Sequence, residues 1–449
     1  GLAIMMVISA WKLSHGPISL AFLSPYIERT LASFHKSFRI RLDDTILTWA
    51  GWERTLDIRV INVRILGEGE ALIASVPELS LSLSAKALVR GMVAPKSIEL
   101  FRPSLKVVRH RDGSLEVGFN SESVKSDEFV RRMFALLMQK PDPTQPVGFL
   151  SKVRIFDADL KVIDQTLQTS WSAPRAQIQL YRGSNGIKGD MNLNLLVGDS
   201  ESNVSVIGEY LENERRFDFG IEFDKVMPSA LAKLSPDLSL FSSVEVPLQG
   251  TLTFSLLGDG TLESIGLDVL GSKGAISLPV KFAEKYGILS LAQRVHLKEF
   301  NFRGRYDGYD EKIEISNLTL DFGSSGKIYL PTPFDHEMPI KTLSARGRYI
   351  GGESRFEFDA VELDLNGPEA SIALNLDTHD DGLSIGASGV VRSFNVDYFP
   401  SHWPRGLASK ARSWVIKHIL DGEVLEARAS LQANYTENNG FELLTIDGD

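Results

Sequence analysis

The sequence predicts a mainly β protein whose strands form an elongated, twisted and mostly antiparallel sheet. Three observations predict this class. Apolar and polar residues alternate in short runs along most of the chain, as they do in strands with one solvated face. Dipeptides that suit tight turns separate many of these runs. Helical periodicity is confined to a few segments.

The clearest strand pair lies in residues 97–119. Ile98 and Leu100 alternate with polar neighbours, and the alternation resumes after Pro103. Asp112-Gly113 then tolerates the positive φ of a hairpin turn, and a second alternating run follows at 115–119. One face of this hairpin is apolar and the other is polar, so only one of its faces can be solvated.

The same period of two recurs along the chain. Near Asn62 the alternation changes face, as it does at a β-bulge. Further runs cover residues 79–83, 191–195, 217–223, 252–256, 313–322, 356–365 and 372–376. The turn dipeptides are Asn185-Gly186, Asp259-Gly260, Asp307-Gly308, Asn366-Gly367, Asp381-Gly382 and Asn439-Gly440. The spacing varies, which indicates a long antiparallel meander with a degenerate repeat.

Four segments have helical character: 122–140, 226–234, 280–295 and 403–420. So few helices cannot cover a sheet of roughly twenty strands. Either the sheet folds onto itself as a sandwich or barrel, or one apolar face stays open.

Composition narrows the class of function. The chain has 449 residues, of which 43% are hydrophobic and 24% charged, which is a foldable composition. Its net charge of -10 argues against a nucleic-acid partner, because phosphate binding needs a concentrated basic surface. It contains 0 cysteines, which removes disulfides, thiolate metal sites and cysteine nucleophiles together.

The first 16 residues are mostly apolar up to residue 13. Three interpretations are open: the cut end of a transmembrane anchor, a signal-peptide core or a buried helix. The absence of a basic leading region favours the anchor, with Trp11 and Lys12 at the membrane interface. Residues 17–36 then predict a juxtamembrane amphipathic helix, which either touches the membrane or packs on the first strands.

A second segment of distinct character spans residues 399–424. Pro404 suits the first turn of a helix, and Leu407 and Trp414 belong to its apolar face. Its cations are Arg405, Lys410, Arg412 and Lys417. These cations are candidates for contact with anionic lipid head groups. The alternative is that the apolar face packs on the sheet and the cations are simply solvated.

The sequence presents no catalytic constellation. Asp335-His336-Glu337 could supply metal ligands, but adjacent residues seldom point to one centre, and the prolines around them indicate a solvated loop. His402 and His418 do not have ligand spacing. Neither a phosphate-binding GxxxxGK[ST] motif nor a GxSxG motif is present. We therefore expect no enzyme activity, no cofactor and no metal.

Four stretches resemble a known family. They are GPISLAFLSPYIERTL, LDDTILTWAGWERTLDIRVINVRIL, FRPSLKVVRHRDGSL, and the residues WP, GLA, AR, WV, H and DGEV between Trp403 and Val424. Together with the alternating strands, they are similar to the AsmA-like family of bacterial envelope proteins, in particular its YhdP branch.

The resemblance implies a single-pass inner-membrane anchor with the bulk of the chain in the periplasm. It also implies an open hydrophobic β-groove, over residues 37–449, that carries phospholipids between the inner and outer membranes. Partners would be phospholipid and the inner membrane, with protein partners at either membrane left open. We expect the groove to be lined by Leu252, Phe254, Leu256, Phe356, Phe358, Leu363 and Leu365.

Two other functions compete with a lipid conduit. One is a structural or partner-binding envelope scaffold with a closed, dry β-sandwich, and the other is an enzyme acting on envelope polysaccharide. A continuous open apolar face favours the conduit, because a monomer's exposed apolar patch is normally only a few hundred Å². A buried pair of sheets favours the scaffold, and a cleft with convergent carboxylates favours the enzyme.

Overall fold

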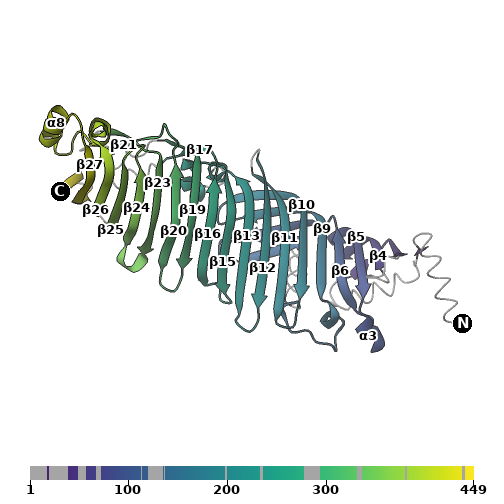
Figure 1. The fold of residues 1–449 in the computed structure, drawn as a ribbon. Coiled ribbons are helices and arrows are strands. Elements are labelled where there is room, and N and C mark those ends of the chain that lie inside the picture. Colours follow the sequence, from purple (N-terminus) through teal and green to yellow (C-terminus); the bar gives the residue numbers. More distant parts are fainter. Residues whose placement is uncertain are drawn as a thin grey trace. The chain divides into compact units, whose positions relative to one another are not determined.

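The computed structural model describes residues 18–19, 39–48, 57–66, 72–112, 114–119, 135, 137–197, 200–232, 236–277, 294–330, 336–379, 382–436 and 440–448. Strands dominate the described chain, which confirms the mainly β class (Figure 1). Among the strands described, 23 belong to one open, mixed sheet. The chain divides into two compact units, unit 1 (Gly1–Ile221) and unit 2 (Glu222–Asp449), and the boundary falls inside one strand, β13 (Arg216–Val226).

Unit 1 is built mainly from strands, which are shortest near its start. They are β1 (Ile18–Ser19), β2 (Arg39–Arg41), β3 (Asp44–Thr48), β4 (Asp57–Leu66), β5 (Leu72–Leu83), β6 (Pro95–Phe101), β7 (Ser104–Arg109), β8 (Leu115–Phe119), β9 (Lys152–Asp164), β10 (Thr169–Arg182), β11 (Gly186–Val197) and β12 (Ser200–Leu211). Among the described connections, α3 (Ala85–Val89) and η3 (Pro146–Phe149) are short helices.

The described pairings of unit 1 are antiparallel, apart from those of β9 with β6 and β7. The predicted hairpin is confirmed, since β7 pairs with β8 in antiparallel register. Both β6 and β7, however, run parallel to β9. Arg102 has a φ of 53° and Pro103 follows it, so β6 and β7 are separate strands. The connection from β8 to β9 is long enough for a parallel crossover, which a pure meander would not contain.

Unit 1 has a sealed apolar core. Val60, Val63 and Val76 are buried there on β4 and β5, with Leu150 and Leu160 from later elements. Asn62 has a φ of 50°, so the buried positions change from Val60 to Val63 across it. This confirms the predicted irregularity in β4 and keeps both halves of the strand facing the core.

In the part of unit 2 that the structure describes, ten long strands form a meander. They are β15 (Leu248–Leu257), β16 (Leu262–Gly271), β19 (Glu299–Asp307), β20 (Lys312–Asp321), β23 (Thr342–Ile350), β24 (Arg355–Asp364), β25 (Glu369–His379), β26 (Gly382–Asn395), β27 (Glu423–Thr436) and β28 (Gly440–Gly448). Each pairs in antiparallel register with the next of the ten. Positive φ at Gly260 and Asn366 confirms the turns predicted there.

Smaller elements fill the connections of unit 2. Separate small sheets are formed by β14 (Val244–Glu245), β17 (Gly274–Ile276) and β18 (Val295–Leu297), and by β21 (Lys327–Leu330) and β22 (His336–Pro339). The helices are α5 (Pro228–Ala232), η4 (Pro236–Ser243), η6 (Gly351–Glu353), η7 (Val396–Tyr398), α7 (Phe399–His402) and α8 (Ser409–His418).

The helix predicted over 403–420 is wrong in its extent. The structure has α7 and α8 instead, and Pro404 lies between them rather than in the first turn of α8. Ala408, the residue before α8, has a φ of 45° and a ψ of 50°, which is left-handed backbone and stops a helix from running through.

The other predicted helices fall partly outside the described residues. The segment 226–234 contains the five-residue α5. Ala135, Leu137 and Met138 are helical, but most of 122–140 and nearly all of 280–295 are not described. Residues 1–16, with the proposed anchor, are not described either. Within 17–36, Ile18–Ser19 pair with β3 as a strand, so the predicted helix is wrong at these two positions.

Among the described residues, no helix combines the length and the apolar character needed to cross a bilayer.

Candidate ligand-binding face

The principal candidate site is the apolar face of the unit 2 sheet. Directly paired residues on neighbouring strands point to the same face, so the register converts the sequence alternation into rows across the sheet. One row contains Phe254, Ile265, Tyr306, Ile313, Tyr349, Phe356, Leu376, Ile385, Ala433 and Leu443. It crosses all ten long strands without a polar side chain other than the tyrosine hydroxyls.

Three further rows lie beside it. The next contains Leu252, Leu267, Gly304, Ile315, Gly347, Phe358, Leu374, Ala387, Leu431 and Ile446. The third runs through Val269, Phe302, Leu318, Ala345, Val361 and Ile372, and the fourth through Phe300, Leu320, Leu343, Leu363 and Ala370. The four rows together make an apolar surface, of which the fourth row is partly covered where Leu343, Leu363 and Ala370 pack with Ile340.

Bulges keep the rows aligned. Register shifts separate Ile315 from Leu318 in β20 and Phe358 from Val361 in β24. Each inserts one residue into the alternation, and without it the second half of the strand would point to the other face. The irregular spacing in these two strands is therefore what keeps both halves on the apolar face.

The side chains on this face are mostly half-buried. Leu252, Phe254, Phe356 and Phe358 all retain part of their surface exposed to solvent. In the described part of unit 2, the cluster of fully buried apolar residues is small and consists of Ile340, Leu365 and Ala370. The arrangement differs from that in unit 1, where a large buried core is present.

The opposite face of unit 2 is polar. Arg303 pairs with Asp268 at 2.7 Å, and Arg348 pairs with Glu357 at 2.6 Å, each across two neighbouring strands. Lys341 donates to Asp364 at 2.8 Å, and this hydrogen bond lowers the pKa of Asp364 and raises that of Lys341. These pairs are solvated, so each adds little to stability, but together they fix which face meets water.

Six of the seven predicted groove residues lie on the apolar face: Leu252, Phe254, Leu256, Phe356, Phe358 and Leu363. Leu365 follows the end of β24 and is only 6% exposed. It packs with Ile340 in the small buried cluster, and its carbonyl accepts a hydrogen bond from His402 Nε2 at 2.6 Å. Leu365 thus supports the connection to α7 rather than the open face.

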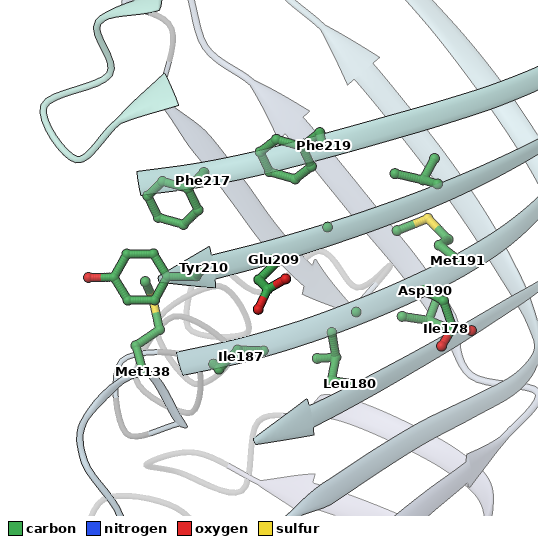
Figure 2. A pocket seen from close by; sticks show the side chains of 13 residues that line it. Met138, Ile178, Leu180, Ile187, Asp190, Met191, Glu209, Tyr210, Phe217 and Phe219 are labelled. Atoms are coloured by element: carbon green, nitrogen blue, oxygen red, sulfur yellow. The ribbon is translucent and has the colours of Figure 1, made fainter. Parts of the chain in front are cut away.

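A second apolar site, which the sequence analysis missed, lies within unit 1 (Figure 2). It is a cavity of about 220 Å³ over β10 to β13, lined by Leu180, Met191, Tyr210, Phe217 and Phe219 among others, with Met138 beside them. Gly189 and Gly208 are directly paired in its floor. A Cβ on Gly208 would lie 3.1 Å from the Phe219 ring, and one on Gly189 would lie 2.9 Å from Leu180 Cδ2.

Gly189 and Gly208 are the feature of the sequence that could have indicated this cavity. Glycine inside an alternating strand marks a place where another group approaches the backbone closely. Here the neighbouring Leu180 and Phe219 side chains occupy that space, and the hollow lies between them (Figure 2).

The predicted membrane-surface cations separate into two groups. Arg405, Lys410 and Lys417 are exposed. Arg412 is half-buried and donates from Nε to the Trp403 carbonyl at 2.9 Å and from Nη2 to the Pro400 carbonyl at 3.0 Å. Arg412 therefore joins α8 to α7 and is not a free surface cation. Trp11 and Lys12 lie outside the described residues.

The described candidate metal ligands, His336 and Glu337, contact different partners. His336 is buried and donates from Nε2 to the Ser401 carbonyl at 2.8 Å, while Glu337 pairs with Lys327 at 3.1 Å. Asp335 is not described. Among the residues that are described, no group of three metal-ligating side chains occurs.

Comparison of the chain with protein-family models, curated proteins and solved structures finds no match.

Proposed function

We propose that this chain binds phospholipid by its acyl chains along the apolar face of unit 2 and conducts it between the inner and outer membranes of a bacterial envelope. The observation that carries the proposal is the pair of apolar rows that cross all ten strands in register, with two shorter apolar rows beside them. The resemblance in sequence to the AsmA-like family supports this proposal. The same resemblance implies that the chain is anchored in the inner membrane.

The energetics favour an extended apolar surface for this task. Burial of a sixteen-carbon acyl chain is worth about 13 kcal/mol at about 0.8 kcal/mol per methylene, so a lipid does not cross water readily. A surface with no deep binding site lets the chain move between rows without losing all of its contacts at once. The charged head group then stays in water, which avoids the cost of burying it.

Aromatic side chains strengthen the case for a lipid ligand. Tyr349 and Phe356 lie with ring centroids 4.5 Å apart on the first row. Their flat faces offer a large apolar contact area with few rotatable bonds, so little conformational entropy is lost when a flexible acyl chain lies on them.

Site-specific photocrosslinking tests the proposal. A benzophenone amino acid at position 254 or 358 should crosslink to phospholipid in cells whose lipids are labelled with radioactive phosphate. The matched controls are positions 251 and 253, exposed threonines that share β15 with Phe254 and whose side chains point to the polar face. Equal lipid labelling at all four positions would contradict the proposal, and protein crosslinks alone at 254 and 358 would favour a scaffold.

A further inference from the structure

The segment that connects β26 to β27 carries an exposed surface that is not part of the apolar face of unit 2. No acidic residue occurs between Asp397 and Asp421, although the chain has 58 Asp and Glu residues and a net charge of -10. The same segment has four cations, of which Arg405, Lys410 and Lys417 are exposed. It is therefore a locally basic region in an acidic chain.

The helix α8 presents its cations and an aromatic ring together. Lys410, Trp414 and Lys417 are spaced by four and three residues, which places them on one side of the helix. The Trp414 ring stacks on His418 with centroids 5.1 Å apart and an interplanar angle of 24°. Arg412 donates hydrogen bonds to the Trp403 and Pro400 carbonyls. These bonds hold in place the helix that carries Lys410, Trp414 and Lys417.

Large apolar side chains next to these cations are exposed. Trp414 is 58% exposed, and Leu420, just beyond the end of the helix, is 79% exposed. Ile419 is exposed too, and α8 itself contains no buried residue. Trp414, Ile419 and Leu420 thus remain accessible to a partner, whereas Val415 and Ile416 are half-buried. Figure 1 shows α8 beyond the ends of β26 and β27.

We propose that Lys410, Trp414, Lys417, Ile419 and Leu420, here called the α8 patch, dock on the surface of a membrane that contains anionic lipids. Charge complementarity selects an anionic partner, because the patch is basic and includes no carboxylate. Tryptophan prefers the boundary between head groups and acyl chains, where its ring is partly apolar and its N–H remains hydrated. Leucine and isoleucine beside it insert into the same boundary and gain burial.

A membrane explains the patch better than an acidic protein does. A protein partner would have to cover Leu420 and Trp414 with a shaped apolar pocket, whereas a lipid surface accommodates scattered apolar side chains between head groups. This docking surface is separate from the apolar face of the sheet, so it can fail while lipid binding along the sheet survives.

Vesicle binding with a local fluorescence signal tests the α8 patch. The whole chain is mixed with vesicles of equal parts phosphatidylcholine and phosphatidylglycerol that carry brominated acyl chains. The quenching assigned to Trp414 is the difference between the wild-type chain and Trp414→Phe. We expect quenching with these vesicles and little with vesicles of pure phosphatidylcholine.

Charge reversal then identifies the cations. Lys410→Glu with Lys417→Glu should weaken binding to the mixed vesicles at least about tenfold, since each cation near an anionic surface contributes about 1 kcal/mol. The control, Lys161→Glu with Lys273→Glu, makes the same charge change at exposed lysines elsewhere and should bind like the wild type. Leu420→Ser changes no charge and should reduce the Trp414 quenching.

Three results would overturn the proposal. Absence of Trp414 quenching with the mixed vesicles would leave an acidic protein as the partner. Equal losses in the two double variants would show a general charge effect, and equal quenching in pure phosphatidylcholine would show that the cations play no part. Unchanged thermal unfolding of each variant establishes that it is folded.

Discussion

At the scale of single residues, glycines allow the strands of the apolar face to lie close together. Gly347 lies between Ile315 and Phe358 in the second row. A Cβ added there would be 2.3 Å from the Glu357 carbonyl oxygen and 2.9 Å from Phe358 Cα, so the backbone itself would have to move. Gly347 is therefore required by the strand spacing and not by its conformational freedom.

Gly347→Ala should consequently destabilise the chain by about 1–3 kcal/mol, the usual cost of overpacking. The matched control is Gly386→Ala on β26, where an added Cβ meets nothing within 4 Å. It should change the free energy of unfolding by less than about 0.5 kcal/mol. Urea unfolding of both variants measures this, and equal effects would show that strand spacing does not depend on Gly347.

His110 gives a pH-dependent signal in unit 1. Its Nε2 lies 2.8 Å from Glu116 Oε2, and this hydrogen bond raises the pKa of His110 above its usual 6.5, with a further contribution from Gln165. A raised pKa means that the folded state binds the proton more tightly than the unfolded state does. The resulting stability is fully present below pH 6.5 and disappears as the pH rises through the raised pKa.

Titration of His110 by NMR should therefore give a pKa above 6.5 in the wild type. Glu116→Gln should bring the pKa down, because an amide cannot attract the imidazolium as a carboxylate does. If the His110 pKa were the same in both proteins, His110 and Glu116 would not be hydrogen-bonded in solution, and this contact beside the β7–β8 hairpin would be wrong.

At the scale of elements, the parallel crossover onto β9 is the main departure from a meander. Glu99 on β6 pairs with Arg154 on β9, and the Glu99 side chain is only 5% exposed. Arg154 also lies over the Phe156 ring at 5.6 Å. The pair thus links two strands that are far apart in sequence, at a place where water is largely excluded.

Glu99→Gln should be strongly destabilising, by up to about 3–5 kcal/mol, because it leaves the Arg154 guanidinium without its countercharge. Glu337→Gln removes a carboxylate from the exposed pair with Lys327 and should cost less than about 1 kcal/mol. Thermal unfolding of the two variants compares them. A loss at Glu99 as small as that at Glu337 would show that the parallel pairing does not rest on this contact.

Local sequence signals predicted most strands and turns of this fold. The alternation in 252–256 and 356–365 and the positive φ at Gly260 and Asn366 follow from side-chain period and turn chemistry. The parallel pairing of β9 could not be predicted in this way, because it depends on a partner about fifty residues away. The break between α7 and α8 follows from left-handed backbone at Ala408. Alanine rarely adopts that conformation, so the sequence does not predict it.

The candidate site was predictable in part for the same reason. Phe254 and Phe358 could be placed on one face by their alternation, but their alignment in adjacent rows required the register of every strand between them. Leu365 has the same spacing as Leu363, yet it lies past the strand end and is buried by Ile340. The unit 1 cavity depends on Gly189 facing Gly208, a pairing that only the register reveals.

At the scale of the whole molecule, unit 1 and unit 2 differ in how far the apolar face of each sheet is buried. Unit 1 buries its apolar residues in a large core and keeps one apolar cavity. Unit 2 has a small buried cluster and leaves its rows half-exposed, with ion pairs such as Arg303–Asp268 on the opposite face. A partly exposed apolar face that crosses ten strands is the kind of surface that binds a ligand, a partner or a membrane.

Lipid carried by the purified, detergent-free chain tests the central claim most directly. Native mass spectrometry with lipid extraction is applied to the wild type, to Phe254→Asp and to the control Thr253→Asp, which alters the neighbouring side chain on the polar face. We predict phospholipid on the wild type and on Thr253→Asp. Phe254→Asp should fold, because its carboxylate can still reach water on a half-exposed face, but should lose the lipid. A wild-type chain without phospholipid, or a folded Phe254→Asp chain with the wild-type amount, would contradict the account.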